Sequence, residues 1–531
     1  MFNRHAGSLI IYLPVMLIKT FGSAVYGVEA TTITIEVNWI HNQGKDPMIV
    51  GLPDNAVKES LQRIESTFKT NEYDFPRTKV VVNMAPADIR KSGTAFDLPI
   101  ALGILAASEQ ITNPEALASY IIMGELSLNG EIRPIKGALP IAIQARKEEF
   151  KGLIVPKVNA KEAGMVNSLN VYGISHINEV IDFFSNGEQG LEPVVINTRD
   201  EFFHSQYNFD IDFSEVKGQE NIKRALEIAA AGGHNAILIG PPGAGKTMLA
   251  KRLPTILPPL TLQEALETTK IHSVAGKLPE NSTLISKRPF RSPHHTISDV
   301  ALVGGGGIPQ PGEISLAHHG VLFLDELPEF KRTVLEVMRQ PMEERKVTIS
   351  RAKVAVDFPA SFMLMASMNP CPCGFYNHPD RACSCPPGAV QKYLNKISGP
   401  LLDRIDLHVE VTPVAFSELS ANKPAETSAA IRERVIRSRE RQAERYKENP
   451  GVYCNAQMSS RMLKEVCVIS PVGANLLKVA MQKLNLSARA YDRILKVSRT
   501  IADLAECEEI KPEHLAEAIH YRSLDREGWG G

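Results

Sequence analysis

Hydrophobic and polar positions follow two different periods in the first third of the chain. Residues 32–39 are apolar at every second position, which predicts a strand. After a helix-capping residue at Asp54 or Asn55, apolar side chains recur at the spacing of one helix face. Further strands are predicted at residues 79–83 and 153–156. Residues 20–185 are therefore expected to form a mixed α/β domain.

Another pattern begins near residue 209. Short, mainly apolar runs are each followed by glycine-rich or polar residues, as in buried parallel strands whose carboxyl ends meet at one edge of a sheet. These runs are residues 235–239, 321–324 and 362–366. Residues 209–413 are therefore expected to form an α/β core, preceded by a linker over residues 186–208.

The last part of the chain, residues 414–531, is predicted to be helical. Residues 431–445 are strongly charged, which indicates a helix with a solvated face. Apolar stripes at residues 476–484 and 494–504 predict a small helical bundle, and Pro512 suits the first turn of its last helix. The expected fold class is thus α/β multidomain with a helical C-terminal part.

Composition limits the classes of function. A chain of 531 residues is too long for one hydrophobic core, so roughly two to four domains are expected. With 59 basic and 60 acidic residues the formal net charge is −1, so overall charge favours neither nucleic-acid nor membrane binding. Four of the seven cysteines crowd between Cys371 and Cys385. This crowding favours a reduced cytoplasmic protein with one metal site over a secreted disulfide framework.

The most informative motif is a glycine-rich segment between a predicted strand and a predicted helix. The G-x-x-x-x-G-K-T spacing in this context is typical of a phosphate-binding loop. Lys246 would reach the β- and γ-phosphates of a nucleoside triphosphate, while backbone N–H groups surround the anion and Thr247 helps to hold Mg²⁺. The cofactor-binding residues expected from this motif are Gly240, Pro241, Pro242, Gly243, Ala244, Gly245, Lys246 and Thr247.

Two other predicted strands end in polar side chains. Asp325 and Glu326 follow the second apolar run, and Asn369 follows the third. Asp325 is expected to hold Mg²⁺ together with Thr247, and Glu326 to polarise an attacking water. Asn369 would hold either that water or the γ-phosphate. The residues themselves therefore predict hydrolysis of a nucleoside triphosphate.

These three constellations, in this order, resemble the Walker A, Walker B and sensor 1 motifs of AAA+ ATPases. Residues 401–406 also resemble the arginine-finger segment of those proteins. The resemblance implies that Arg404 enters the active site of a neighbouring subunit in a ring, usually a hexamer. It further implies a sensor 2 residue at Arg489 in a C-terminal lid, with Arg493 one helical turn later as the alternative.

An insertion between the Walker elements resembles the helix-2-insert clade, which includes magnesium-chelatase ATPase subunits and minichromosome-maintenance helicases. It contains residues 288–295, four glycines at 304–307 and residues 311–320. The glycines predict a mobile loop. Residues 346–356 predict a β-hairpin, which in the clade faces the ring pore. Lys346, Arg351 and Lys353 are therefore candidate DNA contacts, with a solvated hairpin tip as the alternative.

The N-terminal domain resembles the Lon protease domain, a ribosomal-S5-like α/β fold, at residues 124–137. In Lon a serine nucleophile is activated by a lysine amine. The corresponding positions here are Thr94 and Leu139, so the base is absent and peptidase activity is not expected. Ser92 and Lys136 lie close enough in the sequence to keep proteolysis open as an alternative.

Four cysteines form a C-x-C…C-x-C pattern across a short connection. Cys371, Cys373, Cys383 and Cys385 could complete a tetrahedral zinc site, although C-x-C is tighter than the usual C-x-x-C spacing. His378 is an alternative ligand. The expected cofactors are thus ATP and Mg²⁺, with Zn²⁺ as a further candidate.

The whole arrangement resembles the YifB/ComM family. Membership implies a hexameric, ATP-driven DNA translocase, a helicase that promotes branch migration in natural transformation or recombination and acts on single-stranded or branched DNA. ATP hydrolysis follows from the residues, whereas DNA as substrate follows from the resemblance alone. A chelatase-type ATPase subunit that inserts metal into a tetrapyrrole, and an ATP-dependent protease, are the alternatives.

The first residues of the chain bear on its location. The apolar stretch 8–18 is similar to the core of a signal peptide but is too short to span a bilayer. A motor that consumes ATP needs the cytoplasm, so residues 1–19 are expected to be an extension or a start-site artefact, and the protein to be cytoplasmic without membrane contact.

Overall fold

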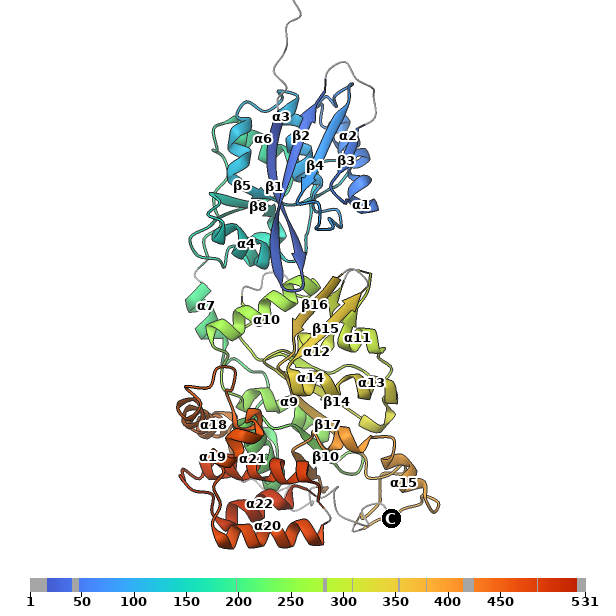
Figure 1. Cartoon of the computed structure of the whole chain (residues 1–531), viewed down its shortest axis with the longest axis vertical. Coiled ribbons are helices and arrows are strands. Elements are labelled where there is room, and N and C mark those ends of the chain that lie inside the picture. The colour runs from blue at the N-terminus through green and yellow to red at the C-terminus, as the bar shows by residue number, and fades with distance from the viewer. Residues whose placement is uncertain are drawn as a thin grey trace, which may run out of the picture. The chain divides into compact units, whose positions relative to one another are not determined.

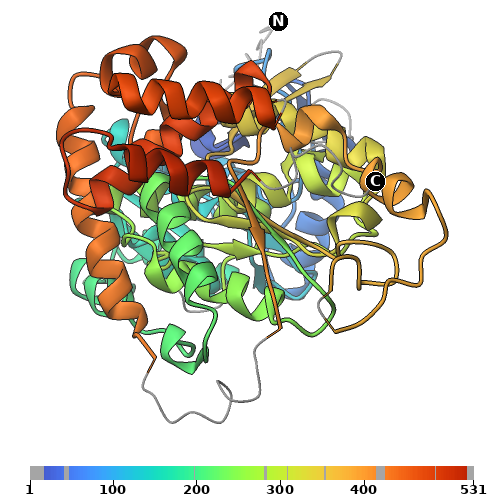
Figure 2. The ribbon, with the colours of Figure 1, turned by 90° about the horizontal axis from the view of Figure 1, so that it is seen from below.

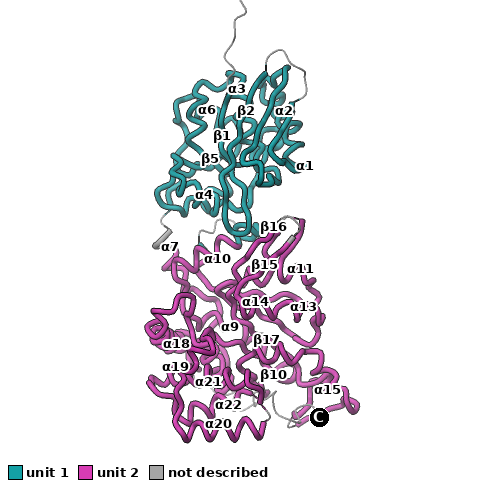
Figure 3. Tube along the Cα trace, viewed as in Figure 1, with its two compact units in different colours: residues 1–199, 272–284 teal, residues 200–271, 285–531 magenta. Residues whose placement is uncertain are grey.

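The chain forms two compact units, each of which is described separately. Unit 1 comprises residues 1–199 and 272–284, and unit 2 comprises residues 200–271 and 285–531 (Figure 3). The computed structural model (Figure 1) describes residues 17–40, 47–196, 198–279, 284–307, 309–351, 354–378, 380–413, 425–484 and 486–522. No helix among these residues is both long and apolar enough to cross a membrane.

Unit 1 is built on a mixed seven-stranded sheet in the order β3-β4-β2-β1-β5-β8-β9. Its strands are β1 (Leu17–Tyr26), β2 (Glu29–Trp39), β3 (Met48–Val50), β4 (Val80–Ala85), β5 (Tyr120–Ile122), β8 (Gly152–Pro156) and β9 (Asn170–Ile174). The alternation at residues 32–39 is confirmed as part of β2, in which Ile33, Ile35 and Val37 are fully buried. The strands predicted at 79–83 and 153–156 are confirmed as β4 and β8.

Helices cover this sheet. They are α1 (Asn55–Lys58), α2 (Ser60–Thr70), α3 (Asp97–Ala107), α4 (Ala138–Lys147), α5 (Lys157–Ala163) and α6 (Ile177–Ser185). Asp54 caps α1, as predicted, by accepting a hydrogen bond from the backbone N–H of Val57. Helix α3 is buried along its whole length because it is apolar on every face. Gly103 allows it to approach β2 closely, since a Cβ there would lie 2.6 Å from Val37.

The sequence pattern did not reveal every element near the ends of unit 1. Strand β1 begins at Leu17, so the last residues of the predicted extension 1–19 belong to the sheet, whereas residues 1–16 lie outside the described part of the chain. Helix α7 (Thr198–Ser205) falls within the predicted linker 186–208, and its Phe202 is buried. One buried aromatic side chain in a polar stretch gives no periodic signal that could predict a helix.

Unit 2 contains a five-stranded parallel sheet in the order β11-β14-β17-β10-β18. The strands are β10 (Ala236–Ile239), β11 (Phe290–Arg291), β14 (Val321–Leu324), β17 (Met363–Met368) and β18 (Leu407–Glu410). The three apolar runs of the sequence form β10, β14 and β17, which are adjacent in the middle of the sheet. All residues of these three strands are buried. Helices α8 (Glu220–Gly232) and α9 (Lys246–Ile256) flank β10 in the chain.

The insertions of unit 2 add short elements to this core. The helices are α10 (Leu262–Ala275), α11 (Asp299–Val303), α12 (Glu313–Leu316), α13 (Arg332–Val337), α14 (Arg339–Glu344), α15 (Ala389–Leu394) and α16 (Gly399–Leu402). The predicted hairpin is confirmed as β15 (Lys346–Arg351) and β16 (Val354–Pro359). The prediction of a mobile loop at 304–307 is wrong for its first half, because Gly304 and Gly305 form β12 and pair with β13 (Gln310–Pro311). A Cβ at Gly304 would lie 2.5 Å from the carbonyl oxygen of Gln310, so glycine permits this pairing.

The C-terminal part of unit 2 is a helical bundle, as predicted. It comprises α18 (Ser428–Arg445), α19 (Ser460–Val466), α20 (Pro471–Lys483), α21 (Ala488–Leu504) and α22 (Pro512–His520). Helices α18 and α21 pack beside α8 (Figures 1 and 2). The buried carboxylate of Asp503 on α21 accepts hydrogen bonds from Arg445 of α18 at 2.5 and 2.9 Å. This ion pair fixes the two longest helices of the bundle to each other.

We expect Asp97→Ala to destabilise unit 1 by about 3 kcal/mol, because it removes one partner of a buried ion pair. The Asp97 carboxylate is fully buried and accepts from Arg63 Nε at 2.7 Å and Nη2 at 2.9 Å. Denaturant unfolding can be followed by fluorescence of Trp39, with the second tryptophan, Trp529, replaced by Phe. Glu65→Ala is the control, since Glu65 forms a solvent-exposed ion pair with Lys69. Its loss should lower the free energy of unfolding by less than about 0.5 kcal/mol. Equal shifts for both variants would contradict the prediction.

Candidate functional site

The phosphate-loop motif lies between β10 and α9, where the sequence places it. Gly243 and Gly245 have φ angles of 79° and 82°, which favour glycine. The ammonium group of Lys246 donates to the carbonyl oxygens of Gly240 at 2.7 Å and Pro241 at 2.9 Å. It also donates to the Asn369 Oδ1 atom at 3.1 Å. The loop therefore presents a cation already directed towards the ends of β10 and β17.

Burial of the Lys246 ammonium group changes its pKa. It lowers the pKa of Lys246 from its ordinary value, while the nearby carboxylates of Asp325 and Glu326 oppose the shift. A partly desolvated ammonium group is held by carbonyl and amide oxygens that a phosphate oxygen can replace. The arrangement thus suits an anion with several phosphates.

Asp325 follows β14 and has both carboxylate oxygens engaged. Thr247 Oγ1 donates to Oδ2 at 2.7 Å, and the hydroxyl group of Ser367 on β17 donates to Oδ1. A hydroxyl and a carboxylate in contact at the mouth of a phosphate loop are the oxygen ligands that Mg²⁺ prefers. Ser367 was missed by sequence reasoning, since its role depends on β17 lying next to β14.

Glu326 has a different environment from Asp325. Its backbone is left-handed, with φ 54°, and its side chain is 58% exposed, so the carboxylate points away from the sheet. The Oε2 atom lies 3.9 Å from Nδ1 of His295. The ring of His294 stacks on His295 with centroids 4.1 Å apart. His295 follows β11, the strand beside β14, and the signal that could have identified it is a histidine pair at that strand end.

Arg404 and Arg489 lie at the opposite edge of the sheet. Residues 403–406 precede β18, whose Leu407 pairs with the first residue of β10, whereas the phosphate loop follows the last residue of β10. The four residues of β10 span roughly 10 Å, which separates the backbone of the two groups. The structure therefore brings together the phosphate loop, Asp325, Glu326 and Asn369, and places both arginines elsewhere.

At this second edge of the sheet, two aspartates form ion pairs with Arg489 and Arg493. Arg489 Nη1 lies 3.3 Å from Asp403 Oδ2, and Arg493 Nη1 lies 2.9 Å from Asp406 Oδ1. Although burial alone would raise the pKa of Asp406, Arg493 and His234 hold it well below its ordinary value. The less favoured sensor 2 candidate, Arg493, is thus a half-buried structural cation, while the Arg489 side chain is 63% exposed.

Arg404 is largely buried between residues of its own chain. Its Nη1 donates to the carbonyl oxygen of Pro400 at 2.6 Å, and Nη2 lies 2.5 Å from Glu343 Oε1. The Nε atom is buried and has no hydrogen-bond partner in the described part of the chain. Glu343, on α14, holds the guanidinium at the surface through one exposed carboxylate.

The candidate DNA-binding hairpin is only partly described. Lys346 Nζ lies 2.8 Å from Asp357 Oδ2, and Thr348 donates to the other oxygen of that carboxylate at 2.5 Å. The Asp357 carboxylate raises the pKa of Lys346 and partly neutralises its charge. Lys353 and the side chain of Arg351 lie outside the described residues.

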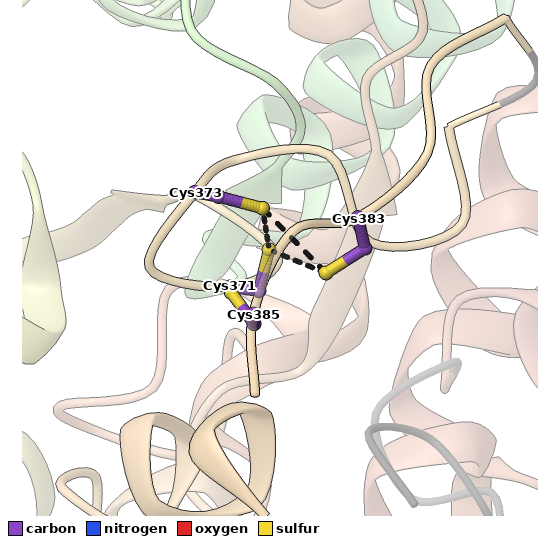
Figure 4. Close-up of side chains that lie close together, drawn as sticks. All are labelled: Cys371, Cys373, Cys383 and Cys385. Atoms are coloured by element: carbon purple, nitrogen blue, oxygen red, sulfur yellow. Dashed lines mark hydrogen bonds between the residues drawn. The ribbon is translucent and has the colours of Figure 1, made fainter. Parts of the chain in front are cut away.

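The four cysteines converge on one point after β17 (Figure 4). Their Sγ atoms all lie within 4.8 Å of one another, and Cys371 is 3.3 Å from Cys373 and 3.7 Å from Cys383. Four thiolates around a tetrahedral Zn²⁺ at Zn–S distances of about 2.3 Å would be roughly 3.8 Å apart. Burial raises the pKa of the Cys373 thiol, but the Phe375 backbone N–H and Cys371 outweigh it and lower the pKa to about 5.

A second group of metal-type side chains lies on α10 and before β14. Glu267, His318 and His319 place their ligand atoms within 4.8 Å of one another. However, His318 Nδ1 accepts a hydrogen bond from the Ser361 backbone N–H at 3.0 Å, so Nε2 carries the proton of the neutral ring. His319 Nε2 lies 3.0 Å from Glu267, and burial lowers the pKa of His319 to about 4. The group is therefore a polar network rather than a metal site.

In unit 1, the positions that correspond to a peptidase site lack its chemistry. The Thr94 hydroxyl donates to the carboxylate of Glu125, which is a weak base. Leu139 is fully buried in α4, and its backbone N–H donates to Glu162 at 2.9 Å. Lys136 packs beside Gly276, also in unit 1. A buried leucine thus occupies the position that corresponds to the lysine base of Lon.

Three family models and several known proteins are similar to this chain. The family models described as "Magnesium chelatase, subunit ChlI", "Subunit ChlI of Mg-chelatase" and "Magnesium chelatase, subunit ChlI C-terminal" match residues 212–419, 35–159 and 425–522. "Competence protein ComM" of Haemophilus influenzae is 44% identical over 508 residues, which cover 95% of this chain and 97% of that protein.

Two further relatives cover the chain to different extents. "Uncharacterized protein YifB" of Escherichia coli is 43% identical over 511 residues, 95% of this chain and 96% of that protein. "Lon protease 2" of Bacillus subtilis is 33% identical over 154 residues, 26% of each chain.

We expect His295→Ala to lower kcat for nucleoside triphosphate hydrolysis about tenfold, or ~1.4 kcal/mol, because the exposed Glu326 carboxylate loses the imidazole beside it. KM should change less than about twofold, since the phosphate loop is untouched. His294→Ala is the matched control and should retain activity. The measurement is steady-state phosphate release, and equal losses in the two variants would contradict a positioning role for His295.

Proposed function

Because the chain belongs to the YifB/ComM family of magnesium-chelatase-like AAA+ ATPases with a Lon-like N-terminal domain, we propose that it is an ATP-driven motor that acts on DNA. The observation that carries the ATPase part is the pair of contacts from Lys246 to Asn369 and from Thr247 to Asp325 at one edge of the sheet. The DNA part is supported by 44% identity over nearly the full length of a protein named for competence. We further propose a role in branch migration during transformation or recombination, in the cytoplasm.

Each residue of the site has a separate task in this proposal. Backbone N–H groups of the loop surround the phosphates while Lys246 leaves its two carbonyl partners for the β- and γ-phosphate oxygens. Thr247 and Asp325 would hold Mg²⁺, which would supply positive charge that neutralises the phosphates. Glu326 accepts a proton from the attacking water, and Asn369 orients that water or the γ-phosphate.

Completion of the site requires a neighbouring subunit. Arg404 and Arg489 lie at the amino-terminal edge of the sheet, so each subunit would offer them to the next one around a ring. The unpartnered Nε atom of Arg404 and the exposed Arg489 side chain support this placement. We therefore propose a closed ring, usually a hexamer in related ATPases, in which every active site is shared.

In this proposal, DNA binds to the hairpin of β15 and β16. Lys346 is paired with Asp357, so the proposal rests more on Lys353 and on the side chain of Arg351. Both lie outside the described part of the chain. Single-stranded DNA would bind such residues through its phosphates, with an affinity that falls as salt rises. A helix-2-insert arrangement of the preceding elements is part of the same proposal.

We also propose that the four cysteines hold one Zn²⁺ ion. The spacing of their sulfur atoms matches a tetrahedral thiolate site. His378 is not required, because its Nδ1 accepts from the Asp380 backbone N–H at 3.1 Å.

A chelatase subunit is the second candidate, because the matching family models carry that description. The match to the competence protein favours the DNA motor, since it covers 95% of this chain and 97% of that protein. Proteolysis is disfavoured by the buried Leu139 and by the contact between Thr94 and Glu125.

We expect single-stranded or forked DNA to raise the ATPase rate of the wild-type protein at least about threefold. Lys246→Ala should abolish ATP binding, because the phosphates lose their cation. Glu326→Gln should retain binding and lose turnover, since the amide cannot accept the proton. The ATPase rate of all three proteins is measured as phosphate release with and without DNA. A wild-type rate that does not respond to any DNA would contradict the DNA part and leave the ATPase part standing.

We expect Arg404→Ala to lower kcat at least about 100-fold while the Kd for ATP changes less than about threefold. Arg461→Ala is the control, because that guanidinium is 90% exposed on the helical bundle. Mixing the Arg404→Ala and Glu326→Gln proteins should restore about a quarter of the wild-type rate, since a random ring pairs an intact Glu326 with a neighbour's intact Arg404 at about one interface in four. No recovery on mixing would contradict a shared site.

A further inference from the structure

The cysteine segment begins two residues after a side chain of the phosphate site. Cys371 follows Asn369, whose Oδ1 atom accepts the hydrogen bond from Lys246 at 3.1 Å. The Tyr393 hydroxyl on α15, beyond the last cysteine, contacts the backbone of Asn369. Asn369 is therefore held by Lys246 and by Tyr393, which lies just beyond the segment that the cysteines close.

The same segment also contacts the phosphate loop itself. Gly374 lies between Cys373 and the second cysteine pair and has φ 86°. A Cβ atom at Gly374 would lie 2.6 Å from Cδ of Pro242, inside the G-x-x-x-x-G-K-T motif. The cysteine segment thus packs against the loop that would hold the triphosphate.

Little besides the cysteines gives this segment a fixed shape. Its described backbone hydrogen bonds are turn contacts, such as Gly374 N to Cys371 O at 3.0 Å and His378 N to Phe375 O at 3.2 Å. The Cys373 and Cys383 side chains are only half-buried. In a short loop without a core, a metal bound by four thiolates supplies the folding free energy, and its binding releases the thiol protons.

We propose that the metal held by the four cysteines is a working part of the ATP site, because it fixes Asn369 beside Lys246 and Gly374 against Pro242. This inference rests on the proposed Zn²⁺ site and on the proposed ATPase activity. Metal-free protein would then keep the phosphate loop and bind ATP, but it would lose the fixed position of the amide that orients the reacting groups. The metal would set the rate of hydrolysis.

The first experiment removes the metal from the full-length protein. Elemental analysis should give one zinc per chain, and a zinc chelator followed by gel filtration into Mg²⁺ buffer should remove it. We expect kcat to fall at least about tenfold, the Kd of a fluorescent ATP analogue to change less than about threefold, and added Zn²⁺ to restore kcat. Circular dichroism and gel filtration verify that the metal-free protein stays folded and assembled.

The second experiment separates the contact with the phosphate loop from the metal itself. Gly374→Ala keeps all four cysteines but places a methyl group against Pro242. Gly388→Ala is the matched control, because Gly388 has φ 78° in the same part of the chain and a Cβ there meets nothing within 4 Å. We expect both variants to retain zinc, and Gly374→Ala alone to lose kcat at least about fivefold.

The outcomes distinguish this inference from the proposals on which it rests. Zinc that can be removed with no change in kcat, or equal rates in the two glycine variants, would overturn the coupling and leave the metal site intact. Purified protein with full ATPase activity and no bound metal would overturn the metal site and the coupling together. Absence of hydrolysis in zinc-loaded wild-type protein would overturn the proposed function.

Discussion

The structure depends on one constraint, the parallel pairing of β10, β14 and β17 in unit 2. Parallel neighbours end at the same edge of a sheet, so the phosphate loop, Asp325 and Asn369 must meet there. Hydrogen bonds from Lys246 to Asn369 and from Thr247 to Asp325 then connect the three strand ends. The fold thus brings the polar groups of three strand ends together, and such preorganisation is the condition for electrostatic stabilisation of a transition state.

Much of this site is predictable from the sequence because its signals are local. An apolar run followed by glycines or carboxylates marks a strand and its carboxyl end, and the motif spacing identifies Lys246 and Asp325. Ser367 and His295 are not predictable in this way, because their partners lie on neighbouring strands and depend on the strand order. Gly304 was misjudged for the same reason, since its pairing with Pro311 lies across a turn that a run of glycines does not reveal.

The positions of Arg404 and Arg489 show a second limit of prediction from the sequence. The motifs identified Arg404 and Arg489, but the sequence alone did not indicate which edge of the sheet they occupy. The fold pairs Arg404 with Glu343 and Arg489 with Asp403, and residues 403–406 lie at the amino-terminal edge. In the proposed ring, each chain would carry two different halves of a site at opposite ends of its sheet, and head-to-tail assembly would bring these halves together.

The two sides of the Lys246 amine are secured by different means. Asp325 is held by Ser367, a residue in the middle of a buried sheet, so its position follows from the hydrophobic core. Asn369 comes after the last residue of β17 and leads into a segment rich in glycine, proline and cysteine, which cannot bury a core of its own. A cross-link through four sulfur atoms can replace the missing core, because it fixes a loop by coordination rather than by packing. In the proposed zinc site, coordination by the loop would thus provide the rigidity that the composition of the loop cannot provide.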